Sequence, residues 1–210
     1  MGDRSVNFAF IHAGVVRVEF MSSVLGIVSN DWIGNMSSST AGPLIAVARN
    51  NIVRNFLEQD QEWLWMVDTD IAFMPDAIDR LMDEADPDEC PVLSALYFVF
   101  AGKTQTPAVY RDSIDIPGTF DAFTEIPGNE VVEAGAVGAG CLLVHRSVFE
   151  KIKKDNDGDE CWFREMVRNG RDVGEDISFC FRVRESGFPI HVHTGVRVGH
   201  MKVALLGEIR

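Results

Sequence analysis

The chain has 210 residues, of which 46% are hydrophobic and 24% charged, and its formal net charge is −13. This length and balance predict a single globular domain, residues 1–210, with enough apolar residues for a sizeable core. The acidic charge argues against a broad nucleic-acid-binding surface, which needs clustered lysine and arginine.

The cysteines and the hydropathy pattern bear on the cellular setting. Cys90, Cys141, Cys161 and Cys180 form no Cys-x-x-Cys pair, so a structural zinc site is not expected. No cleavable leader is recognisable, and no apolar segment reaches the length of a membrane span. We therefore expect a cytoplasmic protein with reduced, buried thiols.

The first predicted elements are a strand over residues 5–11 and a helix over residues 15–28, joined by a turn that ends at Gly14. A strand, a glycine turn and a helix form a usual entry point for nucleotides. The dinucleotide fingerprint Gly-x-Gly-x-x-Gly is absent. His12 in this turn is either a surface-loop histidine or a binding residue.

The next segment, residues 30–43, is rich in Ser, Gly and Asn and is predicted to be a loop. An amphipathic helix over residues 44–59 follows. Arg49 and Asn50 lie within this helix, and the pattern by itself favours a solvated helix face for them over a binding role.

A short apolar strand, residues 63–67, leads directly into Asp68-Thr69-Asp70. Side chains two apart on an extended chain point to the same side, so the two carboxylates are expected to project together from the end of the strand. Two close carboxylates repel unless a cation or protons intervene, which favours Mg²⁺ or Mn²⁺ held with substrate phosphates. Asp-x-Asp also occurs at positions 86–88 and 157–159, in polar stretches that indicate solvated loops.

The middle of the chain continues the alternation of strands and helices. A helix is predicted to open at Pro75, and the apolar run over residues 91–100 is predicted to be one central strand. Residues 102–128 are irregular, so we expect short strands and a functional surface loop there. A short strand over residues 131–134 comes next.

The last third contains two glycine-marked motifs. Gly138 and Gly140 precede an apolar strand, where they either allow close approach of a ligand or form a bulge or turn. Glu175 and Asp176 open a helix, where acidic residues are commonly partners of the helix dipole. Two short strands, residues 189–193 and 196–198, and then His200 complete the pattern. The alternation predicts an α/β fold with a mostly parallel central sheet and helices on both faces.

These segments together resemble the GT-A-type glycosyltransferases, close to the family 2 group, over nearly the whole chain. The resemblance depends on Ala48-Arg49-Asn50, on Trp65-Met66-Val67-Asp68-Thr69-Asp70, on the segment from Gly138 to Arg146 with Phe149, and on Gly174-Glu175-Asp176 with Phe179, Arg182, Gly187 and Val198-Gly199-His200. The first-strand loop, Ile11-His12-Ala13-Gly14, departs from the commonest family 2 form.

The resemblance implies a Rossmann-like GT-A domain and a role for each matching residue. Asp70 and His200 would ligate Mn²⁺ or Mg²⁺, and Asp68 would contact the ribose or the metal. His12 and Arg49 would face the nucleotide, while Gly138 and Gly140 would leave room for the donor sugar. Asp176 would be the general base, with Glu175 contacting the acceptor or the donor sugar.

The implied activity is transfer of a sugar from a nucleotide-diphosphate donor, UDP- or GDP-linked, to an acceptor hydroxyl, with inversion if Asp176 is the base. The acceptor is not identified by the sequence. Two alternatives remain open at this level. One is a nucleotidyltransferase or another metal-dependent phosphotransfer enzyme on a related fold, and the other is a non-catalytic nucleotide-sugar-binding module.

Overall fold

The computed structural model describes residues 5–42, 44–116 and 118–202. The ends of the predicted 1–210 domain, together with residues 43 and 117, lie outside this part. A seven-stranded sheet with the strand order β10-β15-β5-β12-β3-β1-β2 forms the centre of the fold. Its strands are β1 (Val6–His12), β2 (Ile33–Thr40), β3 (Trp63–Asp68), β5 (Val92–Leu96), β10 (Val131–Glu133), β12 (Cys141–His145) and β15 (His191–Arg197).

The central sheet is mixed, and most of its strands share one direction. β1 is parallel to β2 and β3, and β15 is parallel to β5, whereas β12 is antiparallel to both β3 and β5 and β10 is antiparallel to β15. Five of the seven strands therefore run the same way, with β12 and β10 reversed. The predicted α/β fold with a mostly parallel sheet is confirmed.

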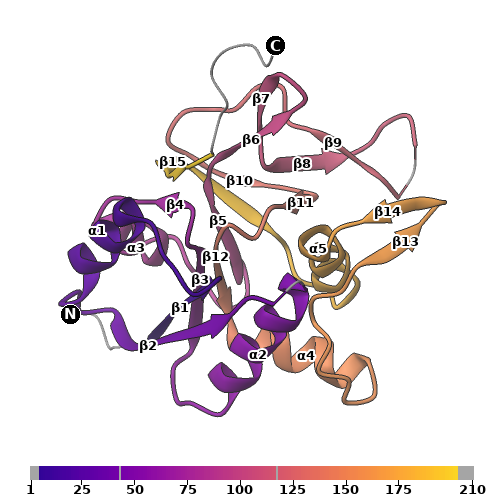
Figure 1. Ribbon diagram of the computed structural model, residues 1–210. Helices are drawn as coiled ribbons and strands as arrows, with labels where there is room; N and C mark the ends of the chain where they lie inside the picture. Colours follow the sequence, from indigo (N-terminus) through magenta and orange to yellow (C-terminus); the bar gives the residue numbers. More distant parts are fainter. Residues whose placement is uncertain (1–4, 43, 117, 203–210) are drawn as a thin grey trace, which may run out of the picture.

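Helices cover both faces of the sheet. The helices are α1 (Val18–Ile27), α2 (Ile45–Leu57), α3 (Ala77–Met82), α4 (Arg146–Asp155) and α5 (Glu175–Glu185). Figure 1 shows α1 and α3 on one side of the strands and α2, α4 and α5 on the other. None of these helices combines the length and the apolarity needed to cross a bilayer; this holds for the described residues.

The alternation of side chains along β3 explains the two cores. Trp63, Trp65 and Val67 pack with α1 and α3, while Leu64 and Met66 pack with α2, α4 and α5. Because successive side chains of a strand point to opposite faces, an unbroken apolar run is what a strand buried on both faces requires.

The predicted loop over residues 30–43 is wrong, because most of this segment is the edge strand β2. Two of its polar side chains bond to residues of other segments. The Ser37 hydroxyl donates to Asn7 Oδ1 at 3.1 Å, and Asn35 donates to the side chain of Gln59. Asn7 is fully buried, and its Nδ2 also donates to Gln59 at 2.9 Å.

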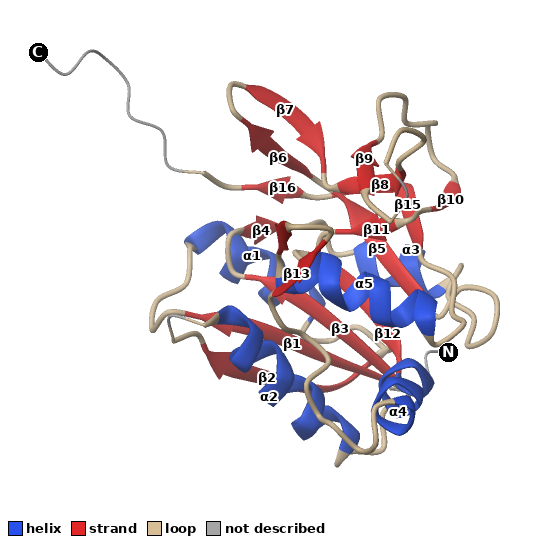
Figure 2. Ribbon diagram, turned by 90° about the vertical axis from the view of Figure 1, so that its right-hand side faces the viewer, coloured by secondary structure: helices blue, strands red, loops and turns tan. Residues whose placement is uncertain are grey.

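The predicted strand over residues 91–100 is divided in two. β5 ends at Leu96, Tyr97 accepts a hydrogen bond from Ala108 N at 3.0 Å, and β6 (Phe98–Ala101) then forms a hairpin with β7 (Thr104–Pro107). Figure 2 shows this hairpin standing away from the central sheet. Conversely, the two strands predicted over residues 189–198 are one strand, β15, whose register on β5 shifts between His193 and Arg197, as at a β-bulge.

Smaller sheets complete the fold. As predicted, residues 102–128 contain short strands: β7, β8 (Val109–Asp112) and β9 (Phe120–Ala122). β8 pairs with β9 and with β11 (Ala136–Val137). β13 (Met166–Arg168) and β14 (Arg171–Val173) form a separate hairpin, and β16 (Gly199–His200) pairs with β4 (Ile71–Ala72). All four cysteines are free thiols.

Candidate active site

A cleft of about 470 Å³ opens at the carboxyl end of β3. Open α/β sheets bind their ligands at this end of the strands. The residues that line it come from segments spread over the whole chain: Ile11, Ala13, Ala41, Ile45, Arg49, Asp68, Thr69, Asp70, Tyr97, Ala139, Gly140, Glu175, Asp176, His200 and Lys202. Most of the residues singled out from the sequence therefore meet in one place.

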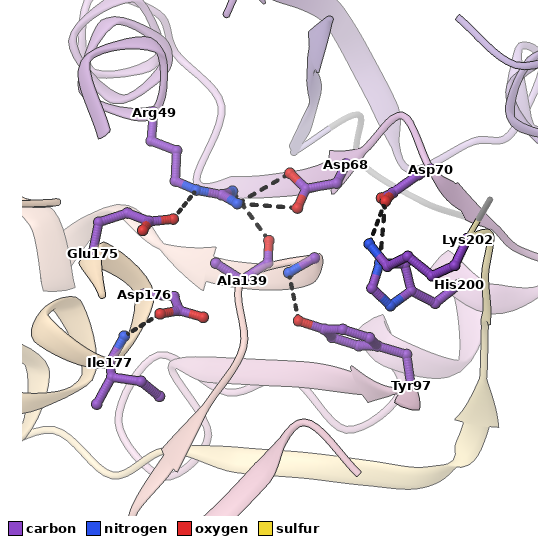
Figure 3. A network of polar contacts seen from close by, with 11 residues as sticks. Arg49, Asp68, Asp70, Tyr97, Ala139, Glu175, Asp176, Ile177, His200 and Lys202 are labelled. Atoms are coloured by element: carbon purple, nitrogen blue, oxygen red, sulfur yellow. Dashed lines mark hydrogen bonds and ion pairs between the residues drawn. The ribbon is translucent and has the colours of Figure 1, made fainter. Parts of the chain in front are cut away.

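The pairing of β16 with β4 brings His200 to Asp70 across 130 sequence positions. His200 lies opposite Ile71 in this pairing, and Met201 N donates to the Asp70 carbonyl at 2.8 Å. The Nε2 atom of His200 is 3.1 Å from Asp70 Oδ2. Figure 3 shows both side chains, with Lys202 beside them.

The second ring nitrogen of His200 defines its protonation pattern. Nδ1 lies 2.9 Å from the Phe98 carbonyl, which can only accept, so Nδ1 carries a proton. In the neutral imidazole Nε2 then carries no proton, and its lone pair faces a carboxylate oxygen. Two acceptors at this distance need a cation or a second proton between them. Lys202 supplies a nearby positive charge, with Nζ 2.9 Å from Asp70 Oδ2.

This donor set fits a divalent cation. One carboxylate and one imidazole converge, and the other imidazole nitrogen is fixed by a backbone carbonyl, as is usual for histidines that bind metals. Across residues 5–42, 44–116 and 118–202, no group of three His, Cys, Asp or Glu side chains is arranged to hold a metal ion. Asp70 and His200 would thus leave several coordination positions to substrate oxygens.

Arg49 links the two acidic motifs of the cleft. Its Nη2 lies 3.1 and 3.0 Å from the two oxygens of Asp68, and its Nε is 3.5 Å from Glu175. Its Nη1 donates to the Ala139 carbonyl at 3.2 Å. Burial disfavours the charged guanidinium, but the charges of Asp68 and Glu175 outweigh this effect and raise the pKa of Arg49.

The sequence pattern placed Arg49 and Asn50 on a solvated helix face, and this is wrong. The two residues are only 3% and 5% exposed. Asn50 donates to the Phe163 carbonyl at 2.8 Å and accepts from Phe163 N at 2.9 Å. Periodicity cannot distinguish a polar side chain in water from one with a buried partner distant in sequence.

Glu175 and Asp176 form the first turn of α5, whose N-cap is Gly174. Asp176 Oδ1 accepts from Ile177 N at 2.7 Å. Desolvation of the partly buried carboxylate, and then the charge of Glu175, raise the pKa of Asp176. A carboxylate with a raised pKa is a stronger proton acceptor than an ordinary aspartate, which suits a general base.

The two glycines before β12 accommodate Tyr97, a residue that sequence reasoning missed. A Cβ atom on Gly138 would overlap the Tyr97 hydroxyl oxygen, and one on Gly140 would lie 2.9 Å from Tyr97 Cζ. Gly140 N donates to the Tyr97 hydroxyl at 3.1 Å, and the Tyr97 ring is edge-on to His200 with centroids 5.4 Å apart. Tyr97 lies within an apolar run, so nothing local in the sequence marks it.

His12 lies at the edge of the site. Its Nδ1 accepts from Gly14 N at 3.1 Å, which fixes the turn after β1. The neighbouring Ile11 and Ala13 line the cleft, while His12 is not among the lining residues. The structure accounts for His12 as a turn-forming side chain, and contact with a nucleotide stays a prediction.

Comparison with known proteins gives the fold. No family model matches the sequence, and no curated protein matches it. Among solved structures, A197 from STIV aligns with a TM-score of 0.62 and 20% identity, covering 94% of this chain and 86% of A197. GalNAc-T7, solved with UDP, GalNAc and Mn²⁺, aligns with a TM-score of 0.57 and 12% identity, covering 93% of this chain and 43% of that chain.

These two likenesses concern the fold alone. The chain spans less than half of the GalNAc-T7 chain to which it aligns. A197 has a GT-A-like fold and GalNAc-T7 is a GT-A glycosyltransferase. The chain therefore has a GT-A-like glycosyltransferase fold, and its activity must be argued from the cleft itself.

Proposed function

We propose that this protein is a metal-dependent glycosyltransferase that moves a sugar from a nucleoside-diphosphate donor to an acceptor hydroxyl. The observation that supports it best is the pairing of Asp70 with His200 at the carboxyl end of β3, on a GT-A-like fold. The same cleft holds a carboxylate suited to act as a base, Asp176. A cation site and a base in one cleft are what this transfer requires.

In the proposed complex, Asp70 and His200 hold Mn²⁺ or Mg²⁺ together with the donor diphosphate. A bound divalent cation would offset the negative charge that develops on the leaving diphosphate. Lys202, which contacts Asp70 in the free protein, is placed to supply a further positive charge to the same phosphates. The donor nucleotide in this proposal is UDP or GDP.

Arg49 and Asp68 hold the nucleotide side of the cleft. Arg49 fixes the Asp68 carboxylate, and Asp68 remains 25% exposed, so its free lone pairs can accept hydrogen bonds from ribose hydroxyls. Gly140 and Tyr97 line the cleft where the donor sugar would lie, and Gly138 admits the Tyr97 hydroxyl without lining the cleft itself.

Asp176 would take the proton of the acceptor hydroxyl as the new glycosidic bond forms. This role requires its carboxylate to be ionised and within hydrogen-bond reach of the acceptor. Glu175 is held by Arg49 and contacts the acceptor or the donor sugar in this arrangement. A base that acts directly on the acceptor favours inversion at the anomeric carbon.

A thermal-shift panel of UDP- and GDP-sugars, each with and without Mn²⁺, tests the proposal. A ligand that binds only the folded state raises the melting temperature. We expect one nucleotide class to stabilise the protein, and only when Mn²⁺ is present. Absence of any Mn²⁺-dependent shift would refute the proposal, and release of pyrophosphate from a nucleoside triphosphate would favour a nucleotidyltransferase instead.

Two variants separate binding from turnover. Asp176→Asn should retain the Mn²⁺-dependent nucleotide shift but lose transfer and donor hydrolysis by about 10²–10⁴-fold, because an amide cannot accept the proton. Asp70→Asn should lose the nucleotide shift itself, since it removes a ligand charge. Near-normal turnover by Asp176→Asn would assign this carboxylate a structural role and make Glu175 the next candidate base.

A further inference from the structure

A second cleft, here called the arginine cleft, lies beside the first turns of α5. Its volume is about 260 Å³, slightly below that of sites for drug-sized ligands. It is bounded by the β13–β14 hairpin, β8, β9 and α5, and Figure 1 shows the hairpin beside α5. The lining residues that carry the argument are Tyr110, Phe120, Arg168, Arg171 and Ile177.

The hairpin places two arginines side by side. β13 and β14 are joined by Asn169 and Gly170, with φ values of 53° and 72°. Positive φ at both central residues is the mark of a type I′ turn, which makes the flanking residues direct partners. Arg168 and Arg171 are those partners, and both line the arginine cleft.

Arg168 is held in position by its surroundings. Its guanidinium lies 4.0 Å from the centroid of the Phe181 ring, and Nη1 is 3.1 Å from Glu185 Oε1. Phe181 in turn stacks on Phe120, with centroids 4.7 Å apart. An arginine fixed by a ring and one carboxylate still has several N–H groups available for a ligand.

Arg171 lacks such partners. Its side chain has no hydrogen bond or ion pair with another described residue, and it is exposed. Like charges directly opposite each other in a hairpin are destabilising. The lining also contains one carboxylate, Asp172, which leaves the arginine cleft with an excess of positive charge in a chain of net charge −13. An anion bound there would relieve the repulsion between the two arginines.

The arginine cleft shares a wall with the active-site cleft. Gly174 and Ile177 line the arginine cleft, while Glu175 and Asp176, between them in the chain, line the other. Tyr110, which lines the arginine cleft, is also close enough to Asp176 to be affected by its charge: burial and then the charge of Asp176 raise the pKa of the Tyr110 hydroxyl. A molecule bound in the arginine cleft therefore lies within one helical turn of the proposed base.

We propose that the arginine cleft is an acceptor subsite that binds a sugar bearing an anionic group, with Arg168 and Arg171 holding a phosphate or a carboxylate. The saccharide part would lie against Tyr110 and Ile177, with its free hydroxyl directed past Gly174 toward Asp176. The acceptor role rests on the proposed glycosyltransferase function, whereas the anion site itself does not.

The test measures direct binding of three probes by titration calorimetry: glucose 6-phosphate, glucuronate and methyl glucoside. The full chain is used with and without saturating nucleotide and Mn²⁺, which fill the active-site cleft and prevent the probes from binding there. We expect both anionic sugars, or one of them, to bind at least about tenfold more tightly than methyl glucoside. The tighter anionic probe then identifies phosphate or carboxylate as the recognised group.

Three variants locate the binding. Arg171→Gln, at an exposed position, should weaken binding of the anionic sugars by about tenfold and leave methyl glucoside unchanged. Arg168→Gln should also weaken binding of the anionic sugars. Because this variant loses the stack of Arg168 on Phe181 as well, thermal denaturation checks that it is still folded. Arg164→Gln is the matched control, since Arg164 is exposed and lines neither cleft.

Equal losses in Arg171→Gln and Arg164→Gln would show diffuse attraction and overturn the proposal. So would equal affinity for charged and neutral sugars, or no binding of any probe. Arg171-dependent binding of an anionic sugar by a protein that binds no nucleotide-sugar would leave the anion site standing and reject the glycosyltransferase. Nucleotide-sugar binding without Arg171-dependent anion binding would reject the anion site and leave the proposed glycosyltransferase function standing.

Discussion

Replacement of Arg49 by methionine is the sharpest test of what holds together the cleft at the carboxyl end of β3. The guanidinium is 3% exposed and contacts Asp68, Glu175 and the carbonyl of Ala139. Methionine fills a similar stem volume but provides no charge and no donor. Asp68 and Glu175 would then face each other across the cleft with no cation between them.

The size of the effect follows from burial. Breaking a buried ion pair by removing one partner costs about 3–5 kcal/mol. Here the abandoned carboxylates keep 25% and 15% exposure, so water offsets part of the loss and about 3 kcal/mol is expected. For a chain of this length, that corresponds to a fall in melting temperature of roughly 6–12 °C.

Urea titration and thermal denaturation of Arg49→Met measure this loss. Arg54→Met is the matched control on the same helix, because Arg54 is 41% exposed and forms a surface ion pair with Glu160 at 3.1 Å. A surface pair contributes at most about 1 kcal/mol. If Arg49→Met is as stable as Arg54→Met, the reasoning that Arg49 holds the two acidic motifs together is refuted.

Three further outcomes are expected. Gly138→Ala should destabilise the protein by about 1–3 kcal/mol in urea titration, because the added methyl overlaps Tyr97; unchanged stability would show that Tyr97 moves freely. Lys202→Met should tighten Mn²⁺ binding in the absence of nucleotide, measured by electron paramagnetic resonance of free Mn²⁺, because it removes the cation that contacts Asp70; weaker binding would contradict this. Asp176→Asn should be more stable than the parent near pH 7, since a raised pKa in the folded state means that ionisation of this carboxyl opposes folding. That gain should shrink as the pH falls and vanish below about pH 3, where the carboxyl is protonated in both the folded and the unfolded protein; a gain that persists there has another cause.

Strands buried on both faces were the easiest elements to predict from sequence. The run from Trp63 to Val67 predicted β3 because an unbroken apolar segment of that length fits a strand covered by helices on either side. The edge strand β2 was not predictable in this way. Ser37 and Asn35 pair with Asn7 and Gln59, which come from other segments, so the local composition of β2 is that of a loop.

The residues of the candidate site also differ in how far the sequence alone reveals them. Asp68 and Asp70 stand out because they directly follow an apolar run that predicts a buried strand. The contact of His200 with Asp70 depends on the pairing of β16 with β4, and periodicity does not reveal such a pairing. Burial of Arg49 likewise depends on carboxylates contributed by β3 and α5.

The structure also changes the argument from which the metal site was predicted. Two carboxylates two positions apart were expected to need one shared cation. Instead each carboxylate has its own positive partner: Arg49 pairs with Asp68, and Lys202 lies against Asp70. The partners differ in kind, because Arg49 is buried and its Nη2 contacts both oxygens of Asp68, whereas Lys202 is 45% exposed on a flexible stem. Only the second pair can open at little cost, so Asp70 is the carboxylate that can exchange its partner for a divalent cation in the proposed complex. Asp68 stays held by Arg49, and in the same proposal it would accept hydrogen bonds from ribose hydroxyls.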